Sequence, residues 1–330
     1  MSTAEHLRRG LSVLCCTVAI TGAAIAPIHA QTFPSRPIEF VVHTSPGGGT
    51  DVFGRAVAEM IMREKIFTQP VTISNRTGGA GGVAFNYIKS KRGDPHAILT
   101  VATGTLLTAA SRPELGFGLE NYTPLAFFAL DPQAIAVPAD SKFRTMKDLI
   151  DAAKREPNAI TSAITSATGT GRLLLYLLER ETGAKFRFVS FKGGSEATTA
   201  VLGGHVPFTP ENLSEMFSLV EAKKLRVLAV SGDKRLPAVP DAPTLKELGY
   251  GISVGTGRAF AMPAGVPKEA AAAMEAALKR VHDSAAWKEF ATRFMYEDVY
   301  LGSADTGQYF MKRRAEMAEF LAHISAPAAK

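Results

Sequence analysis

Cysteine is almost absent from this chain of 330 residues: Cys15 and Cys16 are its two cysteines, and both stand near the N-terminus. The rest of the chain therefore has no disulfide and must rely on a hydrophobic core. After residue 30 the chain also lacks an apolar run of the roughly 20 residues needed to span a membrane. Lysine and arginine form no run, and the net charge is only +6. Such a mild basic excess is poor evidence for nucleic-acid binding but suits an anionic small molecule.

Motifs that would carry catalysis are missing as well. The chain has no His-Glu-x-x-His zinc motif and no Gly-Lys-[Ser/Thr] phosphate loop. Residues 193–197 (GGSEA) resemble a nucleophile elbow without its last glycine, and residues 79–84 (GAGGVA) match the Gly-x-Gly-x-x-Ala dinucleotide fingerprint only outside its usual tight turn. We therefore assign no catalytic residue, no metal ligand and no cofactor. An exported α/β enzyme stays open as an alternative.

The first 30 residues read as a targeting segment. Arg8 and Arg9 precede an apolar run over residues 11–26, and Ala30 ends a stretch suited to cleavage. This is the layout of a secretory signal peptide, with an uncleaved anchor as the alternative. We expect residues 1–30 to be removed and the remaining 300 residues, enough for two domains, to be exported.

The most informative stretch follows at residues 38–51. Residues 38–42 are apolar and β-branched, which predicts a buried strand, and the glycines at 47–49 predict a turn with bare backbone. Thr50 is the predicted N-cap of a helix over residues 51–66, and Asp51 and Arg55 are spaced to pair on its surface. Free N–H groups at a helix N-terminus make a seat for an anion such as a carboxylate. The alternative is a βα turn that binds nothing.

The same arrangement, a strand followed by a loop of small residues and then a helix, recurs along the chain. Short apolar strands alternate with helices, which predicts a parallel or mixed α/β sheet. Residues 97–102 are one of the predicted strands, Thr145 is the predicted cap of a helix over residues 145–154, and Gly183 is predicted to end a helix over residues 172–182. Pro124 and Pro132 bracket a change in the sequence pattern, and residues 134–137 form a predicted crossing strand. Loops rich in Gly, Ser and Thr follow the predicted strands at residues 46–50, 75–82, 103–105, 165–171 and 192–195, and a polar Pro-Glu-Asn loop follows another at 210–212.

Three of these loops precede the proline-marked crossing and three follow it. In open α/β sheets ligands bind at the carboxyl ends of strands, so two such sheets facing each other would form a cleft lined by N–H groups and hydroxyls. The candidate binding residues from these loops are Thr103, Gly104, Thr105, Thr168, Gly169, Thr170 and Glu211. This pattern favours a non-enzymatic protein that binds a small carboxylate.

The chain resembles the periplasmic solute receptors of tripartite tricarboxylate transporters, often called the Bug family. The resemblance lies in FPSRPI at 33–38, PGGGTD at 46–51, GGAGG at 78–82, FKGG at 191–194, PDAPTLKELG at 240–249 and MPAGVP at 262–267. It implies a type II periplasmic-binding-protein fold, with two α/β lobes, a hinge of two crossings and a central ligand cleft. The lobes would be residues 31–130 with 259–330, and residues 131–258.

The resemblance also implies a function. Such a receptor is a periplasmic monomer that captures an organic acid and delivers it to membrane transporter subunits; handing the closed form to a signalling partner is the alternative. In that family the loops after the first two strands anchor a carboxylate, partly through water. Those positions correspond here to Ser45, Gly48, Gly49, Thr50, Gly79 and Ala80. The sequence leaves the identity of the acid open.

One departure from the family bears on the ligand. Where a tryptophan usually precedes the Pro-Ala-Gly signature, this chain has Gly257 followed by Arg258. Glycine there would remove an aromatic cap and open volume. If Gly257 faced the cleft, Arg258 would face away on a strand, whereas a bulge at Gly255 or Gly257 would turn it inward. An inward Arg258 would hold a second carboxylate of the ligand.

Overall fold

The computed structural model describes residues 33–191 and 194–325. The predicted signal peptide and the predicted loop residues Lys192 and Gly193 lie outside these ranges. Residues 33–330 are grouped as one compact unit. In the described ranges no helix is both long and apolar enough to cross a membrane.

The chain folds around a mixed sheet, as the alternation of strands and helices predicts. In the described residues this sheet has eight strands, in the order β10-β4-β9-β3-β1-β2, with β7 and β8 also paired to β4. Its strands are β1 (Ile38–Val42), β2 (Val71–Asn75), β3 (Ala97–Ala102), β4 (Tyr122–Pro138), β7 (Thr209–Asn212), β8 (Leu225–Val230), β9 (Gly255–Pro263) and β10 (Glu297–Leu301). The strands β5 (Thr161–Ile164) and β6 (Arg187–Ser190) form a separate parallel pair.

The α-helices connect these strands. They are α1 (Gly49–Arg63), α2 (Gly82–Ser90), α3 (Thr103–Ala110), α4 (Met146–Arg155), α5 (Thr170–Thr182), α6 (Gly194–Leu202), α7 (Leu213–Glu221), α8 (Lys268–Asp283), α9 (Ala285–Arg293) and α10 (Ser303–Ser325). Short 3-10 turns occupy Gly79–Gly81, Pro113–Leu115 and Leu119–Asn121. The helix expected after Thr145 is confirmed, because the Thr145 side chain accepts from Asp148 N–H in a capping box.

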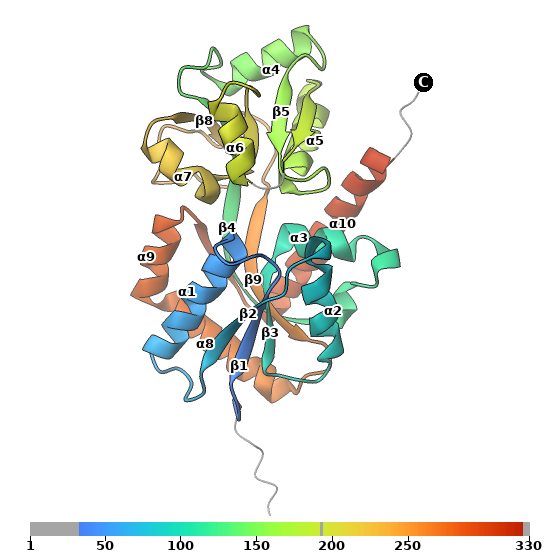
Figure 1. Cartoon of the computed structure of the whole chain (residues 1–330), viewed down its shortest axis with the longest axis vertical. Helices are drawn as coiled ribbons and strands as arrows, with labels where there is room; N and C mark the ends of the chain where they lie inside the picture. Colours follow the sequence, from blue (N-terminus) through green and yellow to red (C-terminus); the bar gives the residue numbers. More distant parts are fainter. Residues whose placement is uncertain (1–32, 192–193, 326–330) are drawn as a thin grey trace, which may run out of the picture. The chain divides into compact units, whose positions relative to one another are not determined.

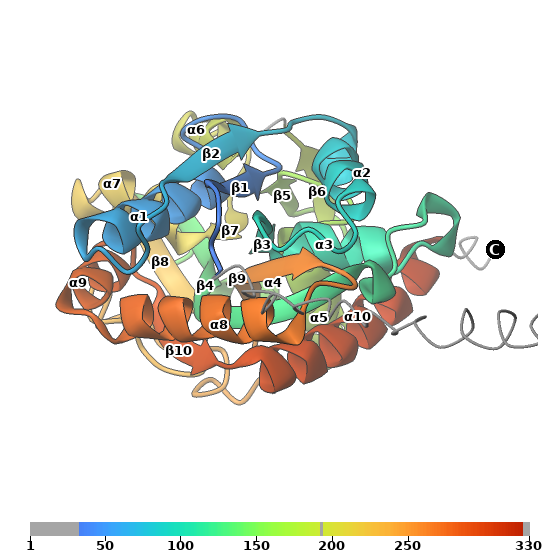
Figure 2. The same cartoon turned by 90° about the horizontal axis from the view of Figure 1, so that it is seen from below.

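Helices cover both faces of the sheet around β1. Successive strand residues point to opposite faces, so Phe40 packs with Phe53 and Leu278 from α1 and α8, while Val41 packs with Phe85 from α2. Figures 1 and 2 show α1 and α2 on either side of β1. Burial on both faces explains why the strand sequence is continuously apolar. The sheet's carboxyl-end loops are thereby held on a rigid base.

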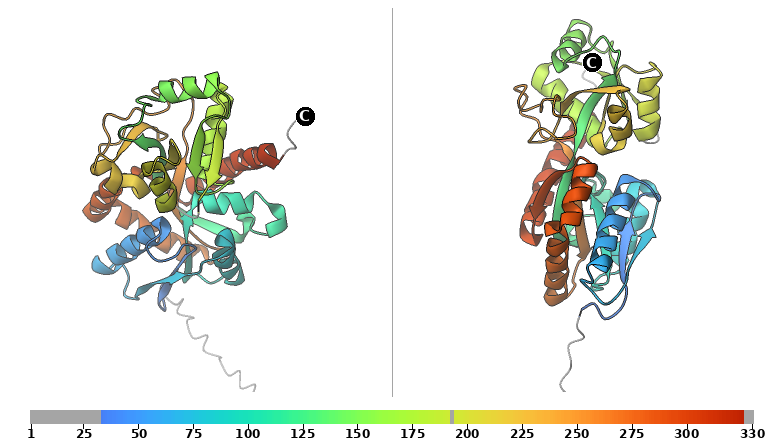
Figure 3. Two further views of the ribbon diagram at one scale, coloured as in Figure 1. Left: turned by 45° about the horizontal axis from the view of Figure 1, so that its top comes forward. Right: turned by 90° about the vertical axis from the view of Figure 1, so that its left-hand side faces the viewer.

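β4 is the longest strand and corrects one prediction. It runs for 17 residues through both Pro124 and Pro132, which bracket the change in the sequence pattern, and the predicted crossing strand at 134–137 is only one part of it. The register between β4 and β9 shifts just after Pro124, and Pro132 stands where β4 leaves β9 for β7 and β8. The missing proline N–H groups are thus tolerated at irregular positions of the ladder. In the right-hand view of Figure 3 this green strand extends from the lower part of the molecule, which holds the blue elements, to the upper part, which holds the light-green and yellow elements.

The predicted lobe boundaries fall inside two paired strands. Asp131 pairs with Thr256 and Ala129 pairs with Arg258, so the boundaries at 130/131 and 258/259 meet in the ladder between β4 and β9. The division into lobes stays a prediction.

The last helix, α10, packs against more than the first set of strands. Phe310 near its start contacts the core around β3 and α3, whereas Met317 and Phe320 join the core of α4 and α5. α10 therefore contacts both cores, because its apolar residues extend over enough length to reach them.

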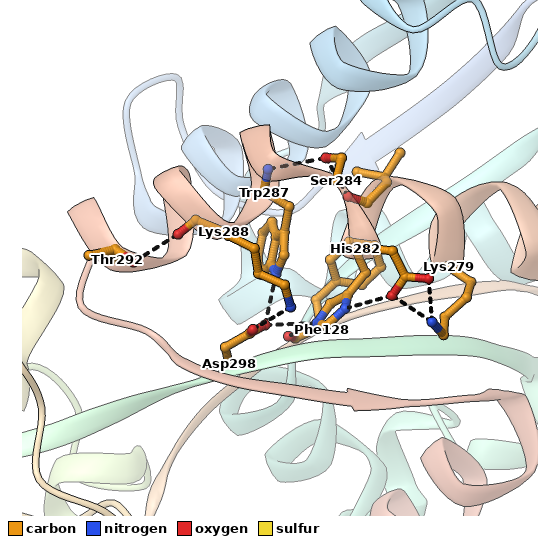
Figure 4. Close-up of polar contacts among 10 residues, drawn as sticks. Phe128, Lys279, His282, Ser284, Trp287, Lys288, Thr292 and Asp298 are labelled. Atoms are coloured by element: carbon orange, nitrogen blue, oxygen red, sulfur yellow. Dashed lines mark hydrogen bonds and ion pairs between the residues drawn. The ribbon is translucent and has the colours of Figure 1, made fainter.

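A corner between α8, α9 and β10 is held by polar contacts around the buried His282 and Trp287 (Figure 4). Asp298 accepts hydrogen bonds from Trp287 Nε1 at 2.9 Å and lies 2.8 Å from His282 Nε2. Burial lowers the pKa of His282, although Asp298 acts in the opposite direction. Ser284 caps α9 by accepting from Trp287 N–H at 3.2 Å. Because these contacts stay within the corner and lie outside the pocket lining, we interpret this cluster as structural.

Candidate functional site

One pocket of about 540 Å³ collects residues from the carboxyl ends of several strands and the first turns of the helices that follow them. The predicted site residues that line it are Gly49, Thr50, Gly79, Ala80, Gly104, Thr105, Thr168, Gly169, Thr170, Glu211 and Arg258. Their convergence on one pocket is a finding; that they contact a ligand stays a prediction.

The N-terminus of α1 forms part of the pocket wall through Gly49 and Thr50. The predicted N-cap at Thr50 is wrong, because the helix begins earlier: Gly48 is the N-cap, with extended dihedral angles (φ −69°, ψ 155°) and no side-chain cap. Val52 N–H closes the first turn on Gly48 O at 2.9 Å. The N–H groups before Val52 have no acceptor within the helix, so they are available to an anion.

Asp51 holds the preceding loop in shape. Its buried carboxylate accepts from Gly47 N–H and Arg55 Nε, both at 2.9 Å, and from Asn75 Nδ2 at 2.8 Å. The same Asn75 nitrogen donates to Thr44 O at 2.9 Å. Burial acts to raise the pKa of Asp51, but these hydrogen bonds outweigh it and the pKa is lowered. The predicted Asp51–Arg55 pair is confirmed, and Gly47 (φ +83°) is the residue that makes the turn left-handed.

The second glycine loop has an unusual backbone. Gly78, Gly79, Ala80 and Gly81 all have positive φ, at 116°, 55°, 51° and 93°, and all four line the pocket. Ala80 carries a Cβ in this left-handed region, a strain of roughly 1–3 kcal/mol that is kept mainly at functional sites. The loop therefore presents main-chain atoms, rather than long side chains, to the pocket.

The first turns of α3 and α5 meet at another wall of the pocket. Thr108 Oγ1 donates to Thr168 O at 3.2 Å, and a Cβ at Gly104 would overlap Thr170 Oγ1. The N-cap of α5 is Gly169, with no side-chain cap, so its first N–H groups are also unused within the helix. The two loops predicted to face each other are thus in direct contact.

Glu211 lies in a strand, which corrects the predicted loop at 210–212. Glu211 and Asn212 belong to β7 and pair with Ala134 and Gln133 of β4. The Glu211 side chain is buried; Oε1 accepts from Asn212 N–H at 3.1 Å, and Oε2 has no hydrogen-bond partner among the described residues. Burial, followed by the negative charge of Glu215, raises the pKa of Glu211 to about 8.

Beside Glu211 lies a small amide cluster. Gln133 Nε2 donates to Asn212 Oδ1, and Thr256 Oγ1 donates to the same oxygen at 3.2 Å. Gln133 is 1% exposed, and its Oε1 has no partner within the described ranges. All three residues line the pocket, as does Glu215 in the first turn of α7. This part of the pocket offers acceptors, in contrast to the donors at α1.

Arg258 is turned inward. It is 2% exposed, lines the pocket, forms an ion pair with the fully buried Asp131, and donates from Nη1 to Thr50 Oγ1 at 3.4 Å. Ser214 Oγ donates to the same Asp131 carboxylate at 2.8 Å. Burial raises the pKa of Asp131, while Arg258 opposes that shift. Of the two orientations considered for Arg258, the inward one is therefore observed, but its charge is already paired.

The position of Gly257 explains this orientation and corrects a second expectation. Gly257 does not line the pocket: a Cβ there would overlap the Phe127 ring and lie 2.8 Å from Thr103 Cγ2. No volume is therefore opened, because Phe127 already fills the space. Arg258, as the next residue, points the other way, into the pocket. The irregularity lies in β4, between Phe127 and Ala129, and not at Gly255 or Gly257.

Three predicted binding residues do not line the pocket. Ser45 O accepts from Gly48 N–H at 3.0 Å within the first loop, and Thr103 Oγ1 accepts from Gly257 N–H at 2.8 Å. These contacts shape the walls around the pocket. Because Ser45, Gly48 and Thr103 are absent from the pocket lining, the prediction that they contact a ligand is not supported.

Sequence reasoning missed several lining residues, among them His43, Gln133, Asn212 and Glu215. A signal existed for Gln133, since it is a polar residue within the apolar stretch at 125–137, and for Glu215, which stands one turn after Glu211. His43 gave none. Burial, with the Arg258 charge, lowers the pKa of His43 to about 4, so this imidazole is neutral at pH 7.

Solved structures define the class of protein. A TctC solute-binding protein from Polaromonas aligns with a TM-score of 0.75 and 28% identity, over 88% of this chain and 100% of that one. Two Rhodopseudomonas palustris proteins share the fold: one solved with malate (TM-score 0.73, 22% identity, 87% and 99% covered) and one with adipate (0.76, 24%, 87% and 98%). The fold is that of a periplasmic solute-binding protein.

Sequence comparison identifies the family. The model of the tripartite tricarboxylate transporter family receptor matches residues 54–324, and the chain belongs to that family. A Cupriavidus necator protein named "UPF0065 protein in gbd 5'region" is 30% identical over 92% of this chain and 93% of its own length. BugT of Bordetella pertussis is 29% identical over 74% and 75%. The resemblance noted in the sequence is thereby confirmed, and the family is one of solute-binding receptors rather than of enzymes.

Proposed function

We propose that this receptor captures a small organic carboxylate in the periplasm and, as a monomer, delivers it to membrane transporter subunits. Membership of the transporter-receptor family supports delivery. The malate and adipate bound by two proteins of the same fold support a carboxylate ligand. A pocket of about 540 Å³ suits a molecule of that size.

The observation that carries this proposal is the meeting of the α1 N-terminus with the left-handed loop at 78–81 in one pocket. Both present main-chain atoms, and the helix adds its dipole, which favours an anion by about 0.3–1 kcal/mol in exposed settings and more when partly buried. Arg258, which lies beside Gly49, already forms an ion pair with Asp131. We therefore place the ligand carboxylate at Gly49 and Thr50.

The proposed mechanism is closure of two lobes around the ligand. The crossings would be β4 and β9, and the Thr108–Thr168 hydrogen bond would form only when the lobes meet. A ligand held at Gly49 on one lobe and at Thr170 on the other favours the closed state, because it makes both sets of contacts only there. The transporter would then recognise the closed form.

A pair of glycine variants tests the carboxylate seat. In Gly49→Ala the new methyl group would lie 2.9 Å from Arg258 Nη2 and beside the free N–H groups, whereas a Cβ at Gly251 meets nothing within 4 Å. Thermal-shift screening of the parent against organic acids finds the ligand, since binding at 100 times Kd stabilises the folded state by about 2.7 kcal/mol. We expect Gly49→Ala to weaken that acid at least tenfold and Gly251→Ala to leave it unchanged. Equal affinity in both variants would contradict the proposed seat, and an unaltered uptake rate in cells lacking the receptor would contradict delivery.

A further inference from the structure

The pocket lining has two parts of opposite character. Gly49 and Thr50 offer N–H donors, whereas Glu211, Gln133 and Glu215, which we call the acceptor end, present oxygen atoms. Glu211 Oε2 and Gln133 Oε1 are buried acceptors without a hydrogen-bond partner among the described residues. Buried polar atoms are almost always paired in native proteins, so two open acceptors in one pocket point to a donor on the ligand.

The two glutamates converge on one place. A Cβ at Gly194 would overlap Glu215 Oε2 and lie 3.3 Å from Glu211 Cγ, so both side chains flank the start of α6. Gln133 Nε2 bonds to Asn212, the neighbour of Glu211 in β7, and Gln133 Oε1 lies 3.7 Å from a Cβ at Gly171 in the first turn of α5. These acceptors therefore lie around β7 and the first turns of α5, α6 and α7.

A second ligand carboxylate fits this end poorly. Arg112 and Arg258 are the arginines of the described lining, and the Arg258 guanidinium is bound to Asp131. A carboxylate placed beside Gln133 would leave its open acceptor unpaired, because a carboxylate has no proton to donate. An ammonium group offers three donors, and its positive charge is favoured once Glu211 ionises.

We propose that the captured acid also carries a protonated amine, which binds Glu211, Gln133 and Glu215 while its carboxylate lies at the N-terminus of α1. This inference rests on the proposed function and adds the class of ligand: an amino acid in the broad sense, rather than a dicarboxylate.

Binding of an amine should release protons. The pKa of Glu211 is about 8 in the ligand-free protein, so its carboxyl is mostly protonated at pH 7.5 and ionises when an ammonium arrives. The charged groups around it are Glu215 of α7, Asp131 of β4 and Arg258 of β9, with Arg172 and Glu196 on the adjoining helices α5 and α6. A dicarboxylate would instead keep Glu211 protonated or take up a proton.

The test is isothermal titration of the full mature chain with matched acids at pH 7.5, in two buffers of different ionisation enthalpy. The pairs are malate with aspartate and adipate with 6-aminohexanoate, in which an amine replaces a hydroxyl or a carboxylate. We expect the amine of at least one pair to bind about tenfold more tightly than its partner and to release protons.

Variants assign the effect to the acceptor end. Glu211→Gln keeps the shape of the protonated side chain, so it should fold; it should lose the preference for the amine and the proton release. Glu221→Gln, at the exposed end of α7, is the matched control and should keep both. Binding of malate and adipate at least as tight as that of their amines in both pairs, or an amine affinity unaltered by Glu211→Gln, would overturn the inference while leaving the proposed function intact. If no organic acid binds, the proposed function itself fails, and this inference with it.

Discussion

Replacing Asp51 with Ala should destabilise the conformation of the first glycine loop and thereby change the shape of the pocket. The substitution removes the acceptor for Gly47 N–H and for Asn75 Nδ2, bonds of 2.9 and 2.8 Å. A hydrogen bond to a charged acceptor contributes about 1.5–3 kcal/mol. Because Gly47 is exposed and the half-buried Asn75 keeps its bond to Thr44 O, the two losses together lie near the low end, about 2–4 kcal/mol. Arg55 is half exposed and regains water, so losing its ion pair adds at most a few tenths of a kcal/mol, about 0.2–0.5.

Urea unfolding measures this change. With an m-value near 3 kcal/mol/M, a loss of about 3 kcal/mol moves the midpoint down by about 1 M. Because the pKa of Asp51 is lowered in the folded protein, its contribution is present above its ordinary value of 3.8 and is lost as the pH falls further; the gap between parent and variant should therefore narrow below about pH 4. Glu59→Ala, at an exposed position of the same helix, is the control.

Ligand affinity should fall with stability in the Asp51 variant. Ordering even one loop residue on binding costs about 1–2 kcal/mol, which corresponds to roughly a tenfold loss of affinity or more. An unchanged urea midpoint together with parent-like affinity would refute the claim that Asp51 shapes the loop.

Three further changes test other parts of the account. Gly257→Ala would place a methyl group against the Phe127 ring, and we expect destabilisation of roughly 1–3 kcal/mol in thermal unfolding; a neutral effect would mean that the space is free. Since the pKa of Glu211 is raised to about 8, the ligand-free parent should lose stability as the pH rises from about 4.5 to 8, and the Glu211→Gln variant should lose less; parallel stability curves would contradict the shift. Asp298→Ala leaves Trp287 Nε1 without its acceptor and should cost about 1–3 kcal/mol in urea unfolding, with ligand affinity unchanged because the corner lies outside the pocket lining.

Local signals in the sequence predicted local structure well. The strand at 97–102 was predicted to the residue, the Thr145 cap forms its capping box, and Gly183 ends α5 with a left-handed φ of 75°. Each depends on neighbouring residues alone. The glycine loops at 47–49 and 78–82 were likewise recognisable, because bare backbone at the end of a buried strand is visible in the sequence.

The errors arise where distant residues decide the structure. β4 continues through Pro124 and Pro132 because its partner strands change there, and β9, its main partner, lies more than 100 residues away. Arg258 could be given two orientations from sequence, since the packing of Phe127 against Gly257 chooses between them. Its ion pair with Asp131 joins residues 127 apart in the chain. The acceptor end of the pocket was missed for the same reason.

A crystal structure of the chain with the acid that most raises its melting temperature tests the central claim most directly. The account predicts that a ligand carboxylate lies within hydrogen-bond distance, about 2.7–3.2 Å, of the Gly49 or Thr50 backbone nitrogen and faces the loop at 78–81. A carboxylate bound instead to Arg258 after displacing Asp131, or a ligand bound outside this pocket, would contradict it.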